Sequence, residues 1–348
     1  MSARKIKIVS IGSGWVATNR HMPTLVASKD FELVGIAGQQ EQKLRAAAKK
    51  YNVPHIYTGD ATKHADWLDT CEAVMIGASP QSHYKLVKFC LKNGKHVLVE
   101  KPFTLSIKES QELVKLAKDK SLTLCIVHNL QFADSAKTLD REIEAGKLGA
   151  INGVHGVQLG NHMRRLPTWY EELPWGLFFD ESPHLMYLLD KYGTKLKPTT
   201  VTKVESTRGL KTPALVLATF KTGLGIPASL YLNFEAPLSE WFLFVYGDKR
   251  IGVLDIFRDI YYSLPNDGRH RARDILNTSY KATYGHLAGT LVSGLKEVTK
   301  THRWGNDEIV ARFARAIRTG IADDLISAED ALRVNKLQFA MIKEATVA

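Results

Sequence analysis

The chain has 348 residues, of which 45% are hydrophobic and 24% are charged, and this composition excludes a disordered or fibrous protein over most of its length. At about 150 residues per domain, the length predicts roughly two domains that can bury their cores without disulfide staples. The net charge of +11 is spread along the chain without a nucleic-acid-binding motif, so it indicates an anionic small-molecule ligand or a solvated basic surface rather than nucleic acid.

Cysteine usage and hydropathy indicate the compartment. Cys71, Cys90 and Cys125 show no CxxC spacing, which argues against a disulfide framework and against a structural zinc site. No apolar run approaches the ~20 residues that span a bilayer, and the amino terminus has no targeting pattern. We therefore expect a cytoplasmic protein that does not bind membranes.

Strands and helices alternate over the first 130 residues, which predicts a doubly wound parallel sheet. The runs rich in β-branched residues predict strands over 5–12, 31–38, 71–79 and 122–129, with another inside 95–102. Amphipathic stretches predict helices through Leu25 and Val26, over 40–52, from His83 to Gly94 and over 106–120.

The rhythm changes after Asn129. A helix over 132–149, a strand over 151–160 and a helix over 176–192 precede strand candidates separated by glycine turns, which predicts an open, mostly antiparallel sheet. Those candidates lie at 200–209, 214–223, 225–235, 240–248 and 250–259. The last 40 residues return to helix, with Ser327 as the expected N-cap. We therefore divide the chain into domains 1–127 and 128–348.

A glycine loop between the first strand and the first helix predicts a dinucleotide site. Gly12, Gly14 and Ala17 form the pattern GxGxxA. Gly12 permits a tight turn, Gly14 lets the backbone approach a pyrophosphate, and Ala17 allows close packing of helix on strand. The helix amino terminus adds free N–H groups and the positive end of its dipole.

The end of the second strand bears on the choice between NAD and NADP. An acidic residue there would bind the ribose hydroxyls of NAD, but this chain has Gly38 followed by Gln39 and Gln40. Lys43 and Arg45 follow closely, either as partners of a 2′-phosphate or as a solvated helix face. The pattern favours NADP, while NAD stays open because glutamines can also serve an adenosine ribose.

The run from Ala78 to Pro102 carries the most specific motif. It combines a strand ending in Ser-Pro, a helix, and the segment GKHVLVEKP, in which Lys101 lies at the carboxyl end of a parallel strand, where open α/β sheets bind ligands. This run resembles the Gfo/Idh/MocA family of sugar and inositol oxidoreductases, although Gln81 stands where asparagine is common. The matching positions are Ser79, Pro80, His83, Gly94, Lys95, His96, Val97, Glu100, Lys101 and Pro102.

The resemblance continues at Asn129, Phe132, 145–151 and 326–345. It implies an amino-terminal Rossmann domain followed by an α+β domain whose open sheet carries the substrate site on one face and often an oligomer interface on the other. We therefore expect a homodimer or homotetramer that binds NAD(P). The residues expected at the cofactor are Gly12, Ser13, Gly14, Trp15, Val16, Gly38, Gln39, Gln40, Ser79, Pro80, His83, Glu100, Lys101 and Asn129.

Residues 175–190 resemble the family's second signature, although Ser182 replaces a common glycine and Asp190 lies further along than the last usual acid. Asp180 and His184 keep an i, i+4 spacing, which places both on one helix face. Pro183 favours a helix that begins near Ser182, and this would leave Asp180 just before the helix. By resemblance, His184 is the general acid/base, Asp180 supports it, and Lys101 polarises the substrate oxygen; all three are expected to touch the substrate.

Other candidates have weaker patterns. His162, Arg164 and Arg165 form a polar segment that either binds substrate hydroxyls or phosphate or is a solvated loop. Trp169, Tyr170 and Trp175 either stack on a sugar ring or pack in the core, and the basic segment from Arg269 to Arg273 either binds a diphosphate or is solvated. His21 follows the glycine loop without a decided role. The remaining histidines show no metal-ligand spacing, so we expect no metal site.

These observations predict hydride transfer between a nicotinamide cofactor and a secondary alcohol or ketone of a sugar, cyclic polyol or sugar derivative, which is possibly nucleotide-linked. One alternative is an NADPH-dependent reductase of a keto-sugar in a biosynthetic route. The other is a non-catalytic, cofactor-sensing regulator on the same scaffold.

Overall fold

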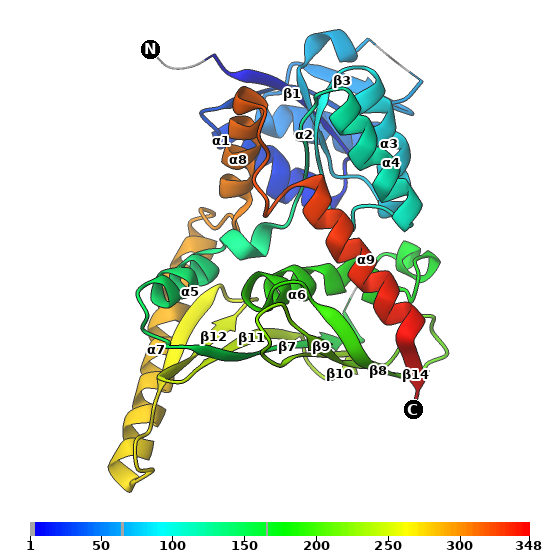
Figure 1. Cartoon of the computed structure of the whole chain (residues 1–348). Coiled ribbons are helices and arrows are strands. Elements are labelled where there is room, and N and C mark those ends of the chain that lie inside the picture. Colours follow the sequence, from blue (N-terminus) through cyan, green and yellow to red (C-terminus); the bar gives the residue numbers. More distant parts are fainter. Residues whose placement is uncertain (1–3, 64–65, 165) are drawn as a thin grey trace. The chain divides into compact units, whose positions relative to one another are not determined.

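The computed structural model describes residues 4–63, 66–164 and 166–348 (Figure 1). Its contacts divide the chain into two units, residues 1–129 with 305–336 and residues 130–304 with 337–348. This differs from the predicted division, which assigned everything after residue 127 to the second domain. The reason is packing: α8 (Asn306–Thr319) returns to the first unit, where Phe313 stacks on Phe31 with ring centroids 5.7 Å apart and Arg318 pairs with Asp30 at 2.6 Å.

The first unit contains a six-stranded parallel sheet with the order β3-β2-β1-β4-β5-β6. The order reverses between β1 and β4, and such a switch point is where open α/β sheets bind their ligands. The sequence analysis missed β3, which is only four residues long and partly exposed. The strands are β1 (Ile6–Ile11), β2 (Phe31–Gly38), β3 (His55–Thr58), β4 (Ala73–Ile76), β5 (His96–Val99) and β6 (Leu124–Ile126).

Helices follow these strands as a doubly wound fold requires. The predicted N-cap of the last helix is confirmed, because the Ser327 hydroxyl accepts a hydrogen bond from the Asp330 N–H at 3.1 Å. Two short helical turns, η2 (Leu68–Thr70) and η3 (Asn129–Phe132), lie in the connections. The helices are the π-turn η1 (Ala17–His21), α1 (Met22–Ala27), α2 (Glu41–Tyr51), α3 (Pro80–Lys92), α4 (Ile107–Asp119), α8 and the first part of α9 (Ala328–Glu344).

The second unit is built on an eight-stranded sheet with the order β13-β12-β11-β7-β10-β9-β8-β14. Its pairs are antiparallel except β7 with β10 and β8 with β14, so the predicted mostly antiparallel sheet is confirmed. The sequence analysis missed β13 and β14. The strands are β7 (Ile151–Asn161), β8 (Lys197–Val204), β9 (Leu215–Lys221), β10 (Ala228–Ala236), β11 (Glu240–Gly247), β12 (Arg250–Asp255), β13 (Ile260–Pro265) and β14 (Ala345–Val347).

One helix dominates the core of this unit. α6 (Leu177–Gly193) packs on β7, β10 and β11, and Figure 1 shows it lying over one face of the sheet. α5 (Asp134–Glu144) and the turn η4 (Thr168–Glu172) precede it, while α7 (Ala272–Val298) packs against β13. Within the described ranges, none of the helices has the length and hydropathy to cross a membrane.

Candidate active site

The glycine loop has the backbone that the motif predicts. Gly12 has φ +123°, and a Cβ there would lie 2.5 Å from the carbonyl oxygen of Gly77, so only glycine fits. Gly14 is different, because a Cβ built on it meets no described atom within 4 Å. Open space beside Gly14, at the amino end of a helix, is what a pyrophosphate needs to approach the backbone.

Ala17 brings that helix close to the sheet. Ala17 is fully buried, and a Cβ on Gly77 would lie only 3.2 Å from the Ala17 Cβ. Trp15, in contrast, is 64% exposed, and the guanidinium of Arg20 lies over its ring at 5.3 Å. The sequence analysis did not single out Arg20, although a cation one turn after a GxGxxA loop is a detectable signal for phosphate binding.

The end of β2 lies beside the glycine loop. A Cβ on Gly38 would be 3.7 Å from the Ser13 hydroxyl, and Gln39 and Gln40, which follow, are exposed. Arg45 pairs with Glu41 at 2.6 Å on the surface of α2. Within the residues that the structure describes, Lys43 forms no ion pair, so it is the better candidate for a 2′-phosphate.

The start of α3 differs from the prediction. The strand expected through Ser79 ends at Ile76, and the helix expected from His83 begins three residues earlier, at Pro80. Proline is favoured in the first helical turn because its φ is preset and its missing N–H has no partner there. Ser79 is the N-cap residue, and its hydroxyl lies 3.3 Å from that of Ser82.

His83 is a buried brace between two segments. Its Nδ1 lies 2.8 Å from the Pro102 carbonyl oxygen, and its Nε2 lies 3.2 Å from that of Ala78. Burial lowers the pKa of His83 in spite of these two carbonyls. His83 therefore ties α3 to the segment that follows β5, where Lys101 and Pro102 are joined by a cis peptide bond.

Glu100 is held by His21, whose role the sequence left undecided. The His21 Nε2 lies 2.7 Å from one carboxylate oxygen of Glu100, and the backbone N–H of Lys101 donates to the other at 3.0 Å. Burial alone would raise the pKa of Glu100, but the hydrogen bond and charge of His21, together with the Lys101 cation, lower it overall. The sheet end thus contains a partly buried carboxylate that accepts the backbone N–H of Lys101.

Asn129 follows β6 as the first residue of η3 and is partly exposed. The residue before it, His128, is buried, and its Nδ1 lies 3.0 Å from a carboxylate oxygen of Asp330. The start of α9 is therefore attached to the sheet end that presents Asn129.

The helix that carries Asp180 and His184 agrees with the predicted range 176–192 and not with the start near Ser182 that Pro183 favoured. It starts at Leu177, so Asp180 lies inside it and the i, i+4 stacking with His184 is intact. The prediction of a start near Ser182 was wrong because Pro183 is accommodated within the helix. Pro183 cannot donate to the Phe179 carbonyl, and the side-chain amide of Gln338 donates to that oxygen instead, at 2.9 Å.

His184 is one of two residues of α6 that are not buried. Every other residue of α6 except Lys191 is buried, whereas His184 is partly exposed. Its Nδ1 lies 2.8 Å from the Tyr187 hydroxyl, which also accepts the backbone N–H of Leu130 at 3.1 Å. The sequence analysis missed Tyr187, although its i+3 spacing from His184 was available as a signal.

Trp241 of β11 adds a second missed residue near His184. The two rings have centroids 5.6 Å apart. Trp241 is buried, and its indole N–H has no hydrogen-bond partner in the described part of the chain. A buried donor without an acceptor is unfavourable, so this N–H is a candidate to donate to a bound oxygen.

Asp180 and its neighbour Glu181 are both buried carboxylates. Burial and then the charges of these two groups raise the pKa of Tyr170, so its hydroxyl stays protonated. Glu181 itself accepts hydrogen bonds from Gln158 at 2.6 Å and from Arg164 at 2.8 Å. Asp180 therefore lies in a buried polar region close to Tyr170.

Arg164 contacts a carboxylate of its own unit. Its guanidinium pairs with the buried Glu181 at 2.7 Å, and a buried carboxylate requires such a partner. Its binding to a substrate stays a prediction. His162 is exposed, and its carbonyl oxygen accepts a hydrogen bond from Arg208 at 3.3 Å. Arg165, the third residue of this segment, lies outside the described residues.

The aromatic and basic candidates mostly contact their own neighbours. Trp169 and Tyr170 have ring centroids 4.1 Å apart, and Trp175 meets Phe178 edge-on at 5.1 Å. In the basic segment, the Arg271 Nε lies 3.1 Å from Asp274, at the start of α7. These contacts favour packing for the aromatic residues and a solvated helix start for the basic ones.

A comparison with known protein families finds a match within the first unit. A family model described as an oxidoreductase family with an NAD-binding Rossmann fold matches residues 6–128. Over residues 6–128 the chain therefore matches the Gfo/Idh/MocA oxidoreductase family. The resemblance that the EKP segment indicated is therefore confirmed.

Three relatives illustrate how far this family likeness extends. An uncharacterised oxidoreductase of Schizosaccharomyces pombe is 35% identical over 217 residues, which are 58% of this chain and 55% of that protein. A scyllo-inositol 2-dehydrogenase (NADP+) of Bacillus subtilis is 27% identical over 146 residues, covering 42% and 43%. A dehydrogenase from Clostridium difficile superposes with a TM-score of 0.75 at 16% identity, covering 98% of this chain and 99% of that one, and so shares the fold of this chain.

The chain spans about half the length of the curated relatives it matches. The comparisons therefore show the family likeness of residues 6–128 and the two-unit fold of the chain.

Proposed function

We propose that this protein is an NAD(P)-dependent oxidoreductase that moves a hydride between nicotinamide and a secondary alcohol or ketone of a sugar, cyclic polyol or sugar derivative. The observation that carries the proposal is the glycine loop. Gly12 makes the turn with φ +123°, and open space beside Gly14 leaves the backbone accessible at the helix start. A bound nicotinamide cofactor supplies or accepts the hydride.

The residues around the loop fit such a cofactor and favour NADP. Gly38 replaces the acid that would bind the ribose of NAD, and Gln39 and Gln40 present exposed amides beside Ser13. Lys43 is an exposed cation one turn into α2, and Arg20 is a further cation close to the loop. We propose that Lys43 neutralises the 2′-phosphate and that Arg20 assists at the pyrophosphate.

The chemistry requires a proton to leave or join the substrate oxygen as the hydride moves. We propose that His184 exchanges this proton, since an imidazole titrates near neutral pH. Tyr187 orients the ring through its contact with Nδ1. Asp180 supports the cationic form of the ring, and Lys101 stabilises negative charge that develops on the substrate oxygen.

For the substrate we propose a compound with neighbouring hydroxyl groups. The name of the Bacillus relative describes a dehydrogenase of a cyclic polyol that uses NADP+. A second candidate within the same chemistry is reduction of a keto-sugar, which Gly38 favours because it fits an NADPH-dependent enzyme. The three cysteines are buried free thiols, which suits a reducing compartment, and we propose a cytoplasmic location.

Titration with NADH and NADPH, followed by nicotinamide fluorescence, tests the cofactor. We expect NADPH to bind at least about 10-fold more tightly and Lys43→Ala to remove most of this preference. Lys49→Ala is the matched control, since Lys49 is also exposed on α2 but lies in its last turn. Failure to bind either dinucleotide would refute the proposed function, and tighter NADH binding would refute the NADP preference alone.

A variant of Lys101 tests whether this protein is an enzyme or a non-catalytic, cofactor-sensing regulator. We expect Lys101→Met to reduce turnover of a polyol or keto-sugar panel by at least about 100-fold while cofactor binding changes less than about 3-fold. Unchanged turnover in this variant would contradict the role of Lys101. Cofactor binding without turnover of any member of the panel by the unmodified protein would favour the regulator.

A further inference from the structure

A stripe of apolar side chains runs along α7 and faces away from its own unit. None of the 27 residues of α7, all of them described, is buried. The α7 stripe consists of Leu276, Tyr280, Tyr284, Leu287, Leu291 and Leu295, whose exposed fractions lie between 56% and 69%. Single exposed apolar residues need no explanation, but a continuous row of six marks a surface that another molecule covers.

The spacing of the stripe keeps it straight. Its residues are separated by 4, 4, 3, 4 and 4 positions, an 11-residue repeat of 3.67 residues per turn. This value lies so close to the 3.6 of an α-helix that the row stays on one face over its whole length. A straight row suits pairing with another helix without pronounced supercoiling.

The opposite face of α7 is already occupied. A Cβ on Gly289 would lie 2.4 Å from the side chain of Ile260, and one on Gly285 would lie 3.0 Å from the Cβ of Tyr262. Both glycines therefore let α7 approach β13 closely, and His286 reaches Asp255 of β12 at 3.1 Å. Glycine is a poor helix former, so we attribute the order of α7 to its contact with the sheet. Because this contact uses the glycine face, the stripe on the other face points outward.

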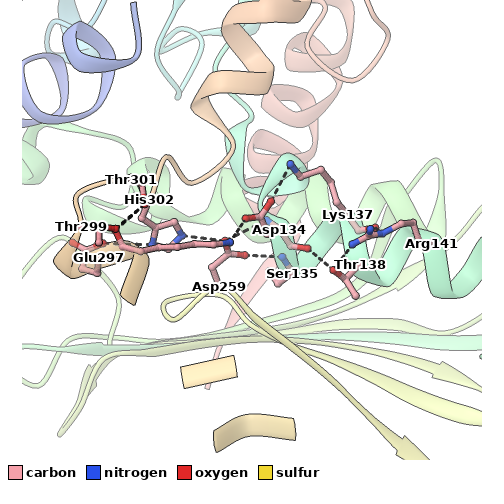
Figure 2. A network of polar contacts seen from close by, with 11 residues as sticks. Asp134, Ser135, Lys137, Thr138, Arg141, Asp259, Glu297, Thr299, Thr301 and His302 are labelled. Carbon is pink, nitrogen blue, oxygen red and sulfur yellow. Dashed lines mark hydrogen bonds and ion pairs between the residues drawn. The ribbon is translucent and has the colours of Figure 1, made fainter. Parts of the chain in front are cut away.

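Polar contacts also hold the carboxyl end of α7 (Figure 2). Lys296 pairs with Asp134 at 2.6 Å, at the start of α5. The next segment is held by His302, whose Nε2 lies 3.0 Å from Asp259, and Asp259 in turn accepts the backbone N–H of Ser135 at 2.8 Å. The stripe is thus presented on a braced helix, which lowers the entropic cost of binding a partner.

We infer that the α7 stripe binds the α7 stripe of a second copy of this chain, antiparallel and across a two-fold axis near Leu287. In this register Tyr284 of one copy faces Leu291 of the other, and Tyr280 faces Leu295. Each tyrosine ring thereby meets a leucine side chain. Both copies use the same surface patch, as a two-fold interface requires.

The area of the stripe fits this occupant. At about 150 to 250 Å² for a large side chain, the exposed parts amount to roughly 700 Å² per chain, close to the ~800 Å² per partner of a stable interface. The polar residues beside the stripe include both signs, such as Lys281 and Glu297. A membrane-binding helix would have a strongly basic polar face instead, so a second copy fits better than a lipid surface.

The particle mass in solution tests the pairing, measured by light scattering over about 1 to 50 μM protein, a range in which a standard interface stays closed. We expect the double variant Leu287→Glu/Leu291→Glu to halve the mass and raise the dissociation constant at least about 100-fold. Ser279→Glu is the control, since Ser279 is exposed on α7 but lies off the stripe. Circular dichroism checks that the variants stay folded, as expected for side chains that are not buried.

Cross-linking tests the register. A short bismaleimide should join two copies of Leu287→Cys but not two copies of Leu276→Cys, because antiparallel helices place the latter pair on the order of 30 Å apart. A mixture of Leu276→Cys and Val298→Cys should cross-link. The native cysteines are buried, so the unmodified protein is the blank.

Three results would overturn the inference. The first is an unmodified protein with the mass of one chain, including one that binds phosphatidylcholine vesicles as a monomer. The second is a particle mass that the double variant leaves unchanged. The third is cross-linking of Leu276→Cys to itself, which an antiparallel pair forbids.

Discussion

The side-chain amide of Gln338 donates a hydrogen bond to the backbone carbonyl of Phe179 at 2.9 Å, in place of the N–H that Pro183 lacks. The same amide nitrogen lies 3.1 Å from the Ser182 hydroxyl. A residue more than 150 positions along the chain thereby lets α6 continue through a proline. This continuity is what places Asp180 and His184 one turn apart on one helix.

Replacing Gln338 tests this relationship. We expect Gln338→Met to lower the free energy of unfolding by about 1 to 3 kcal/mol, because it leaves a buried carbonyl without a donor. In a Pro183→Ala background the loss should be smaller, since residue 183 then supplies the missing N–H. Urea denaturation of the four proteins gives the coupling energy. If Gln338→Met lowered the free energy of unfolding equally in both backgrounds, its effect would not arise from the Phe179 carbonyl.

The two loop glycines should separate folding from cofactor binding. Gly12→Ala brings a Cβ within 2.5 Å of the Gly77 carbonyl oxygen at φ +123°, so we expect a loss of about 2 kcal/mol or more in stability. Gly14→Ala meets no described atom within 4 Å, so its stability should change by less than about 0.5 kcal/mol. Its cofactor dissociation constant should nevertheless rise about 10-fold or more, because the added methyl group lies where the phosphates approach.

Thermal denaturation and fluorescence titration measure these two quantities. If Gly14→Ala binds the cofactor as the unmodified protein does, the loop is a structural turn only.

Variants of His184 and Tyr187 should have different effects on the kinetics. We expect His184→Asn to reduce kcat by about 10²- to 10⁴-fold at unchanged cofactor affinity. Tyr187→Phe should reduce kcat about 10-fold and shift the pH profile of kcat/KM, because the hydroxyl at 2.8 Å from Nδ1 then no longer orients the ring.

Tyr192→Phe is the control for the tyrosine. Its hydroxyl, also on α6, bonds Asp140 at 3.0 Å, so this variant loses a comparable hydrogen bond. Steady-state kinetics over a range of pH distinguishes the two, and a shifted profile in both variants would mean a general loss of order in α6.

His83 should make the first unit sensitive to acid. Burial lowers the pKa of His83, so the folded protein keeps this ring neutral while the unfolded chain takes up a proton below about pH 6.5. A depressed pKa in the folded state means that its stabilisation is present above this pH and is lost as the pH falls.

The variant His83→Asn isolates this effect. It should be less stable than the unmodified protein at pH 7 by about 1 to 3 kcal/mol, because one buried carbonyl loses its partner. It should lose less further stability between pH 7 and pH 5. Urea denaturation at both pH values checks this, and parallel losses in the two proteins would exclude His83 as the titrating group.

Local signals in the sequence were sufficient for most of the first unit. The strand endings at glycine, the GxGxxA loop and the EKP segment each depend on residues close together in the chain, so their physics can be recognised without the fold. Short or partly exposed strands escaped this approach. β3 and β13 lack a continuous buried run, and neighbouring strands hold them in place instead.

Local sequence signals could not identify the hydrogen-bond and ion-pair partners of the site side chains. Nothing near Glu100 in the sequence indicates that His21 contacts it, and nothing near Arg164 indicates the buried Glu181. Burial creates the demand for a partner, and burial depends on how distant segments pack. The pairing of Arg164 with Glu181 could not be predicted from the sequence for this reason.

By itself, the sequence determined the family, the parallel sheet with its phosphate loop, and the presence of Lys101, Asp180 and His184, because motifs and hydrophobic periodicity are local properties of the chain. Only the tertiary structure decided that 305–336 return to the first unit, that α6 continues through Pro183, and that the α7 stripe faces outward. Each of these depends on contacts between residues far apart in the chain, and their free energy appears only once the fold brings them together.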